Sequence, residues 1–360
     1  MAKTILIEEF LNLAAKHPIV DVRTPAEFQA GHIPQAANLP LFTNEERKII
    51  GTIYKQEGRE PAILKGLELI GPKLKDFVKL SLNIHLVFGD KQGNVMNANG
   101  RIDNKTLLLY CWRGGMRSAS VAWLLELYGF KIFLLKGGYK SFRRATIGIF
   151  NQPRKLLVLG GKTGSGKTVI LNELNKNGQQ IVDLEAMANH KGSSFGALGE
   201  AAQPSQEQFE NLLANALRNS DAGTIVWLED ESRSVGKVII PLGLWSQMRS
   251  CKVIDLQISF DDRVKNLIRN YGQFEKEELK AAVERIKKRL GGLNFKFALL
   301  ALDKDDIKSA CEIILSYYDK AYNFGIGKRD PLGVIPFPFG EYDVQQIARE
   351  LINMTSNKYI

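Results

Sequence analysis

Short apolar runs alternate with amphipathic segments through the first part of the chain. Buried strands are predicted at 19–22, 36–39, 106–110 and 131–135. Apolar positions three and four apart predict helices over 26–30, 45–54, 62–82 and 118–127. The polar segment 88–104 is expected to form a loop or hairpin. Alternation of this kind indicates an α/β domain with a mainly parallel sheet.

A second α/β pattern follows and gives way to a largely helical C-terminal third. Its strands are predicted at 155–159, 180–183, 224–228 and 253–258, and its first helices at 169–176 and 206–218. The predicted organisation is a first domain over 1–145, a linker over 146–153 and a second domain over 154–360.

Composition narrows the class of protein. A length of 360 residues suits about two domains, and 44% hydrophobic residues suffice for real cores. No apolar run approaches a membrane span and the N-terminus lacks a signal-peptide pattern, so we expect a cytoplasmic protein. Three cysteines without a Cys-x-x-Cys motif predict neither a disulfide framework nor a structural zinc site.

The net charge of +10 suggests a polyanionic partner, although many soluble proteins are simply basic. Clustering is more informative than the total charge. One cluster comprises Lys136, Lys140, Arg143, Arg144, Arg154 and Lys155, and a second comprises Arg285, Lys287, Lys288 and Arg289 on a predicted helix. Both are candidates for contact with nucleic acid. The second cluster equally suits a solvated helix face.

The segment 111–118 joins a predicted strand to a predicted helix and contains the first candidate site. Successive backbone N–H groups in such a loop form a concavity for anions, and the helix dipole adds positive potential. Both effects favour a thiolate, so Cys111 is predicted to be a nucleophile with a lowered pKa. Arg117 is placed to hold a tetrahedral oxyanion beside the sulfur. The alternative is a buried cysteine beside a turn. The expected anion cradle is Trp112, Arg113, Gly114, Gly115 and Met116.

The pattern Gly161-x4-Gly166-Lys167-Thr168 is a complete P-loop between a predicted strand and a predicted helix. Its backbone can wrap a phosphate, Lys167 can neutralise phosphate oxygens, and Thr168 can ligate Mg²⁺. The predicted phosphate-binding residues are Gly161, Lys162, Thr163, Gly164, Ser165, Gly166, Lys167 and Thr168. The motif does not identify the phosphate compound.

Acidic residues end two strands of the second domain and are predicted to form a rim near the P-loop. Acids at such strand tips can hold the water shell of a metal, although a solvated acidic turn gives the same pattern. No metal ligand beyond Thr168 is assigned from the sequence. The rim candidates are Asp183, Glu185, Glu229, Asp230, Glu231 and Arg233.

The first domain resembles rhodaneses, which carry sulfur on the loop cysteine as a persulfide. The resemblance rests on 21–28, on 31–36 and on the Cys111 loop, and it implies structural roles for Asp21, Arg23 and His32. The whole chain resembles the bacterial tRNA 2-selenouridine synthases, in which a rhodanese domain is fused to a P-loop domain. The matching segments are 111–118, 137–140, 161–168, 183–185, 189–196, 229–233 and 285–292. Lys191 stands where that family would have arginine.

The resemblance implies a specific reaction. The substrate would be tRNA with 2-thiouridine at the wobble position. Geranyl diphosphate, bound at the P-loop, would alkylate the sulfur, and selenophosphate would then replace the S-geranyl group by selenium. Cys111 would form a selanylcysteine intermediate. Neither co-substrate is a tightly bound cofactor, and Mg²⁺ is an optional companion of the diphosphate.

Two other functions fit the same motifs. One is a rhodanese-type sulfurtransferase with a regulatory nucleotide-binding domain, which would show thiosulfate:cyanide activity and ATP hydrolysis. The other is a nucleic-acid-binding ATPase in which the rhodanese domain is only a scaffold.

Overall fold

The computed structural model describes residues 2–91, 105–340 and 342–356, and the chain divides into two compact units. Unit 1 is Met1–Gly148 and unit 2 is Ile149–Ile360. The boundary between the units lies inside the expected linker over 146–153, and helix α7 (Gly138–Ile149) occupies the first half of that segment. Within the described residues no helix has both the length and the apolar content needed to cross a membrane.

Unit 1 is built on a five-stranded parallel sheet with the order β1-β5-β4-β2-β3. The predicted α/β fold is therefore confirmed. The sheet also includes β1, and helix α1 follows β1 in the chain. The sequence predicts neither element. The strands are β1 (Lys3–Ile5), β2 (Ile19–Asp21), β3 (Ala37–Asn38), β4 (Thr106–Tyr110) and β5 (Lys131–Leu135).

Helices cover both faces of this sheet. Alternate β4 residues point to opposite faces, so each face of the strand meets different helices. Leu107 and Leu109 pack with α6 (Met116–Leu127) and α5 (Leu74–Lys91). Leu108 and Tyr110 pack with α1 (Ile7–Ala14) and α7. Five consecutive buried residues in β4 are what a strand inside a parallel sheet requires.

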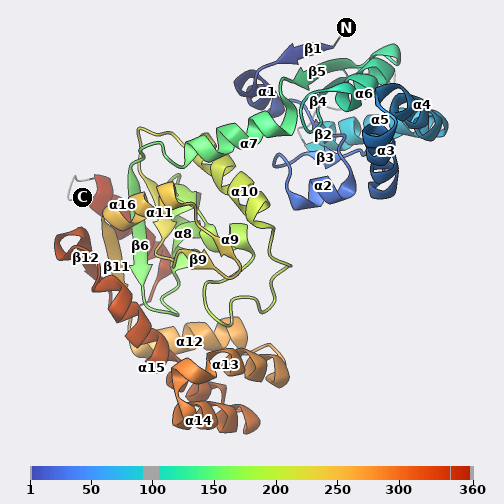
Figure 1. Cartoon of the computed structure of the whole chain (residues 1–360). Helices are drawn as coiled ribbons and strands as arrows, with labels where there is room; N and C mark the ends of the chain where they lie inside the picture. Colours follow the sequence, from blue (N-terminus) through green and yellow to red (C-terminus); the bar gives the residue numbers. More distant parts are fainter. Residues whose placement is uncertain (1, 92–104, 341, 357–360) are drawn as a thin grey trace. The chain divides into compact units, whose positions relative to one another are not determined.

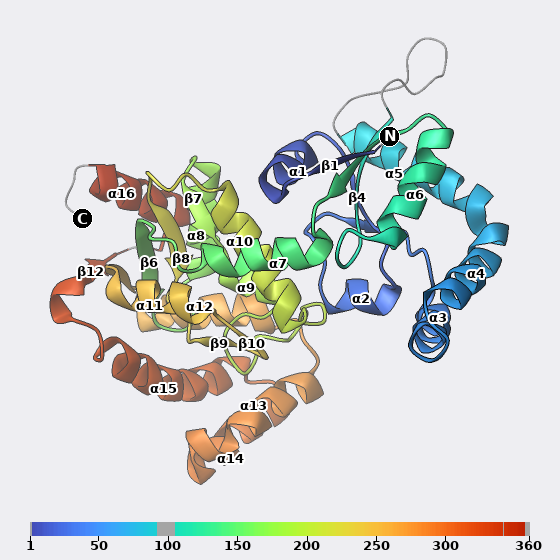
Figure 2. The same cartoon turned by 45° about the horizontal axis from the view of Figure 1, so that its top comes forward.

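The segment predicted as one helix over 62–82 forms two. The helix α4 (Arg59–Ile70) stops at a short 3₁₀ turn over Gly71–Lys73, and α5 begins at Leu74. Pro72 explains the break, because proline lacks the N–H that a continuing helix needs. Figures 1 and 2 show α3 (Asn44–Gln56), α4 and α5 next to one another. The expected loop or hairpin over 88–104 is helical as far as Lys91, and 92–104 lie outside the described residues.

Unit 2 contains a second five-stranded parallel sheet, with the order β12-β11-β6-β8-β7. The C-terminal third is largely helical, as predicted, but it also returns β12 to the edge of the sheet. A two-stranded antiparallel ribbon stands apart. The strands are β6 (Leu156–Gly161), β7 (Gln180–Val182), β8 (Val226–Glu229), β9 (Ser234–Val235), β10 (Val238–Ile239), β11 (Val253–Gln257) and β12 (Val334–Pro338).

The unit 2 sheet has helices on both faces. Leu157 and Leu159 pack with α8 (Lys167–Lys176) and α16 (Val344–Ser356), and Leu156 and Val158 face the opposite core. That core includes α9 (Leu184–Ala188), α10 (Gln206–Asn219) and α11 (Leu242–Ser250). The remaining helices gather beside the sheet (Figure 1): α12 (Phe260–Tyr271), α13 (Lys276–Leu290), α14 (Gly292–Asp303) and α15 (Ile307–Ile326).

Each sheet places a strand-to-helix turn where the chain changes direction across the sheet. In unit 1, β4 leads to β5 on one side while β2 leads to β3 on the other. In unit 2, β6 leads toward β7 while β8 leads back to β11. Ligands of open α/β sheets bind at the carboxyl ends of strands at such points. The Cys111 turn follows β4 and the P-loop follows β6.

Gly138 lets α7 pack directly against the Cys111 turn. Its φ is +58°, and a Cβ atom there would collide with the Cys111 carbonyl oxygen and lie 2.8 Å from the Arg113 nitrogen. We expect Gly138→Ala to lower the free energy of unfolding by roughly 1–3 kcal/mol, because backbone must move and a left-handed φ is strained. Urea unfolding of the full chain measures this.

Gly148 supplies the matched control in the same helix. A Cβ atom at this position would have no neighbour within 4 Å, and the φ of Gly148 is not in the left-handed region. Gly148→Ala should leave stability unchanged or raise it by up to about 1 kcal/mol. Equal effects of the two substitutions would contradict the packing role given to Gly138.

Candidate active sites

The backbone turn after β4 surrounds the Cys111 sulfur with hydrogen-bond donors. The Gly115 N–H donates to Sγ at 3.3 Å and the Ser118 hydroxyl lies 3.2 Å from it. Burial alone would raise the pKa of the Cys111 thiol. Hydrogen bonds from Ser118, Gly115 and Arg113 outweigh burial, and the net pKa is lowered. This is the environment of a thiolate nucleophile.

The other two cysteines have the opposite environment. Burial raises the pKa of Cys251 to about 11 and that of Cys311 to about 11. Both belong to apolar clusters, as ordinary core thiols do. Cys111 is therefore the thiol of this chain that is ionised most readily.

A buried ion pair between Arg23 and Asp21 supports the Cys111 turn through Tyr139. Arg23 and Asp21 are fully buried and joined through the Arg23 Nη2 and Nε atoms at 2.6 and 2.9 Å. The Arg23 guanidinium also lies 3.8 Å from the centre of the Tyr139 ring. The Tyr139 N–H in turn donates to the Cys111 carbonyl at 2.8 Å. These contacts agree with the structural roles expected for Asp21 and Arg23.

His32 is also held in a structural setting. Its ring stacks on Phe28 with centroids 3.8 Å apart, and its Nδ1 lies 2.9 Å from the Phe28 carbonyl oxygen. Burial lowers the pKa of His32. A neutral, stacked imidazole of this kind fixes the end of α2 (Pro25–Ala30).

Cys111 opens into a wide pocket within unit 1, which we call the thiolate pocket. It encloses about 2030 Å³ including its open mouth. Apolar side chains of α3 and α4 form much of its wall, including Ile50, Ile63 and Leu67. Trp112 and Met116 line it as well and are 39% and 52% exposed. The basic residues around it are Arg47, Lys48, Lys55, Arg59, Arg113 and Arg117.

The sequence does not identify the cationic residues of α3 and α4 as part of this site. Arg47 and Lys48 belong to a segment that the sequence predicts only as a helix, over 45–54, and Lys55 follows that segment. A signal existed, since Arg47, Gly51 and Tyr54 share one helical face with Lys55. Nothing in the sequence, however, shows that this face turns toward Cys111.

Arg117 does not act as a free oxyanion holder in this structure. Its guanidinium makes a bidentate ion pair with Glu27, at 2.6 and 3.1 Å. Glu27 also completes the capping box at the start of α2. Burial opposes ionisation of Glu27, but hydrogen bonding to Arg117 outweighs it and the pKa of this carboxyl is lowered. Arg117 is thus a lining residue held in place by Glu27.

The P-loop of unit 2 forms a cradle stabilised by neighbouring helices. Lys167 Nζ lies 3.0 Å from the Gly161 carbonyl oxygen, across the loop. The Gly161 N–H donates to the Tyr322 hydroxyl at 2.7 Å. Among the described residues, the buried Ser165 hydroxyl has no hydrogen-bond partner. A loop with glycines at left-handed φ and an unpaired buried donor is suited to phosphate oxygens.

The opposite side of the P-loop is tied to α12. Arg263 donates to the Thr163 carbonyl at 3.2 Å and Asn266 donates to the Gly164 carbonyl at 3.0 Å. Arg263 is itself fixed by a bidentate ion pair with Asp319, at 2.6 and 2.8 Å. Lys162 is half-buried in the same loop. Helices α12 and α15 therefore hold the outer backbone of the phosphate cradle.

Three of the predicted rim acids lie close to the P-loop. The Thr168 hydroxyl donates to Glu185 at 2.7 Å. Burial raises the pKa of Glu231 to about 8, with a further contribution from the nearby charge of Glu185 and an opposing one from Lys167. Burial also raises the pKa of Glu229 well above its usual value. Glu229 accepts a hydrogen bond from the Leu184 N–H at 3.0 Å.

The other rim candidates have structural roles or lie outside the cradle. Asp183 caps α9 by accepting from the Ala186 N–H at 2.8 Å. Asp230 pairs with Arg329 at 2.6 Å and is unavailable to a ligand there. Arg233 is exposed on the turn before β9. Within the described residues no group of three or more His, Cys, Asp or Glu side chains could hold a metal ion.

The predicted tRNA-contacting residues also divide into two groups. Lys136, Lys140 and Arg144 are exposed in or beside α7, where Arg143 is half-buried. Arg285 instead donates to the Ser194 carbonyl at 2.8 and 3.1 Å, so it fixes the 189–196 loop. Lys287 lies 4.6 Å from the Phe295 ring centre, and Lys288 is exposed on the same helix. Lys191 pairs with Glu200 at 2.8 Å.

The comparisons with known proteins cover both units. A family model described as the tRNA 2-selenouridine synthase AAA domain matches residues 154–344, and a rhodanese-like domain model matches 6–145. A tRNA 2-selenouridine synthase of Psychromonas ingrahamii is 32% identical over 87% of this chain and 89% of its own length. The corresponding protein of Shewanella pealeana is 34% identical over 88% and 91%.

This chain belongs to the tRNA 2-selenouridine synthase family. A relative of that name from Nitrosomonas europaea is 37% identical over 71% of this chain, and the match spans 64% of its own length. A crystal structure of an N-terminal domain from Clostridium difficile 630 is 38% identical, covers 39% of this chain and 97% of its own, and has a TM-score of 0.33. The family resemblance inferred from the motifs is confirmed.

The Ser118 hydroxyl is the side chain that most directly stabilises the Cys111 thiolate. We expect Ser118→Ala to raise the pKa of Cys111, so that alkylation by iodoacetamide is slower near neutral pH and its midpoint moves to higher pH. Peptide mass spectrometry across a pH series measures the rate at Cys111. Ser120→Ala, on the same helix, is the control. An unchanged midpoint in Ser118→Ala would exclude this role.

Proposed function

We propose that this chain is a tRNA-modifying transferase with two successive activities. It geranylates wobble 2-thiouridine with geranyl diphosphate and then replaces the S-geranyl group with selenium from selenophosphate, which gives 2-selenouridine. The single observation that carries the proposal is the presence of two separate anion cradles in one chain of this family. One surrounds the Cys111 thiolate, and the other is the P-loop.

The P-loop supports the first activity. The uridine sulfur attacks the first carbon of geranyl diphosphate, the carbon–oxygen bond breaks, and diphosphate leaves with the electron pair. The proton from the uridine ring nitrogen passes to solvent. Lys167, the Ser165 hydroxyl and the loop N–H groups are placed to receive the negative charge that develops on the diphosphate. Donors fixed in advance around such charge are an effective source of catalysis.

The thiolate pocket supports the second activity. Selenophosphate is a small tetrahedral anion and would occupy little of a space of about 2030 Å³. The apolar wall formed by Ile50, Ile63 and Leu67 suits an S-geranyl group, and the surrounding cations suit phosphates of the anticodon loop. An unpaired anticodon-loop base reaches such a pocket at low cost, because little stacking is lost.

The exchange at the base is balanced without an oxidant. Selenium bonds to the ring carbon, geranylthiolate leaves with the electron pair of the carbon–sulfur bond and takes a proton, and water releases phosphate from selenium. Cys111, in its lowered-pKa environment, is proposed to carry a proton in this step: its thiolate accepts the proton of hydrogen selenophosphate and passes it to the departing geranylthiolate. The selanylcysteine that the family resemblance predicts is not a step of this exchange, because joining selenide-level selenium to a thiolate needs a two-electron oxidant. Selenophosphate and geranyl diphosphate are co-substrates, and the proposed site of action is the cytoplasm.

Mg²⁺ is compatible with the P-loop only as a companion of the diphosphate. Thr168 and Glu185 lie together at the cradle, while Glu229 is buried and Asp230 is paired with Arg329. Mg²⁺ keeps several water ligands and commonly binds through one or two carboxylates plus phosphate oxygens. Thr168 and Glu185 are the residues proposed to contact it, and its contribution would be neutralisation of the diphosphate charge.

Two substitutions should separate the two activities. Cys111→Ser should lower selenation of pre-geranylated tRNA by at least ~10³-fold and leave geranylation intact. Lys167→Ala should lower geranylation of 2-thiouridine tRNA by about 10²–10³-fold and spare selenation. Nucleoside mass spectrometry of each tRNA measures both. Cys251→Ser, which removes a core thiol, controls for the loss of a cysteine.

The outcome also distinguishes the alternative functions. If Cys111→Ser still converts S-geranyl tRNA to the seleno form, the proposed mechanism is wrong. A protein that transfers sulfur from thiosulfate to cyanide and hydrolyses ATP, yet modifies neither tRNA, is a sulfurtransferase with a regulatory nucleotide domain.

A further inference from the structure

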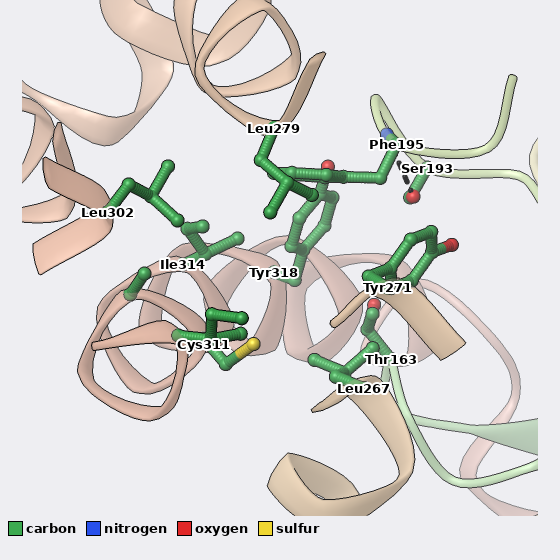
Figure 3. Close-up of a pocket in the computed structure, with 12 residues that line it drawn as sticks. Thr163, Ser193, Phe195, Leu267, Tyr271, Leu279, Leu302, Cys311, Ile314 and Tyr318 are labelled. Carbon is green, nitrogen blue, oxygen red and sulfur yellow. Dashed lines mark hydrogen bonds between the residues drawn. The ribbon is translucent and has the colours of Figure 1, made fainter. Parts of the chain in front are cut away.

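Unit 2 contains a cavity between helices α12 to α15 and the P-loop. We call it the helical cavity. It encloses about 40 Å³, and the space becomes about 480 Å³ when the open solvent at its mouth is included. Figure 3 shows side chains that point into it, and helices α12 to α15 contribute most of them. Leu267 and Tyr271 come from α12, Leu279 from α13 and Leu302 from α14, while α15 contributes Ala310, Cys311, Ile314 and Tyr318.

The wall of the helical cavity is formed almost entirely by hydrocarbon. Its two tyrosines use their hydroxyl groups elsewhere. The Tyr318 hydroxyl accepts from the Ser194 N–H at 3.0 Å, and Tyr271 is hydrogen-bonded to Ser193. Their rings therefore serve as apolar surface. A nucleoside placed here would leave its polar groups without partners, which is costly in an apolar space.

The P-loop itself forms one edge of this cavity. Thr163 lines the cavity and is also the third residue of the phosphate-binding motif (Figure 3). The helix α12 connects the two features, because Arg263 and Asn266 hold the loop backbone while Leu267 and Tyr271 face the cavity. The loop and the cavity therefore adjoin at Thr163, and a ligand with a diphosphate head and an apolar tail is the chemical class that would suit both.

We propose that the helical cavity binds the hydrocarbon chain of a prenyl diphosphate whose diphosphate lies in the P-loop. This inference rests on the proposed geranylation activity and assigns the chain of that donor to a site. Leu279, Leu302 and Ile314 line the cavity on the side away from Thr163 (Figure 3), so their side chains limit the length of chain that fits. Geranyl diphosphate should bind at least ~100-fold more tightly than inorganic pyrophosphate, because several carbons of its chain leave water.

Substitutions that fill or enlarge the cavity test this assignment. Ala310 is 1% exposed and lines the cavity, so Ala310→Leu should shorten it. We expect at least ~10-fold weaker binding of geranyl diphosphate and unchanged binding of pyrophosphate. Leu279→Ala should improve binding of farnesyl diphosphate relative to geranyl diphosphate by ~10-fold. Isothermal titration of the full chain with the three ligands measures these ratios.

A matched control separates cavity binding from loss of stability. Leu351 is fully buried on α16 and does not line the cavity. Leu351→Ala should destabilise the protein to a similar degree as Leu279→Ala but leave the farnesyl-to-geranyl ratio at its wild-type value. Thermal unfolding with and without pyrophosphate shows that each variant is folded during the titrations.

The inference and the proposed function fail in different ways. If geranyl diphosphate binds much more tightly than pyrophosphate but neither cavity variant changes the ratios, the chain binds elsewhere and the inference is wrong. If geranyl diphosphate binds wild-type protein no more tightly than pyrophosphate and no S-geranyl nucleoside forms, the proposed geranylation itself is wrong.

Discussion

The placement of both reactive loops follows from one constraint on parallel sheets. A strand inside such a sheet has its N–H and C=O groups paired along its length, and the first unpaired N–H groups occur where it turns into a helix. At the point where the strand order reverses, the connections on the two sides diverge and leave room for a ligand beside that turn. Each unit contains such a turn, one with Cys111 and the other with Lys167. Backbone donors thus create both anion cradles before any side chain is considered.

The side chains around the two cradles differ in charge. Cations line the thiolate pocket, and hydrogen bonds lower the pKa of Cys111 despite its burial. Acids surround the P-loop, and burial raises the pKa of Glu231 to about 8. The first environment favours RNA and a small anion beside a thiolate. In the second, Lys167 lies near Glu231, whose neutral form is favoured by burial, so the charge of Lys167 is available to a diphosphate.

Local sequence was sufficient to predict both loops and their flanking strands, because glycine spacing and a buried strand specify a turn through local backbone geometry. It was not sufficient where a role depends on contacts distant in sequence. Arg117 pairs with Glu27, Asp230 with Arg329, and Arg285 with the Ser194 carbonyl. Each pairing joins residues more than 85 positions apart, and no pattern near either partner indicates it. The helical cavity is similarly invisible in sequence, since its wall is drawn from four helices.

The central claim is that geranylation precedes selenation on the same base. The most direct test is mass spectrometry of tRNA nucleosides from wild-type protein given geranyl diphosphate alone, selenophosphate alone, or geranyl diphosphate followed by selenophosphate. The account predicts S-geranyl-2-thiouridine in the first reaction, unchanged 2-thiouridine in the second, and 2-selenouridine in the third. Formation of 2-selenouridine from selenophosphate alone, at the rate of the sequential reaction, would contradict it.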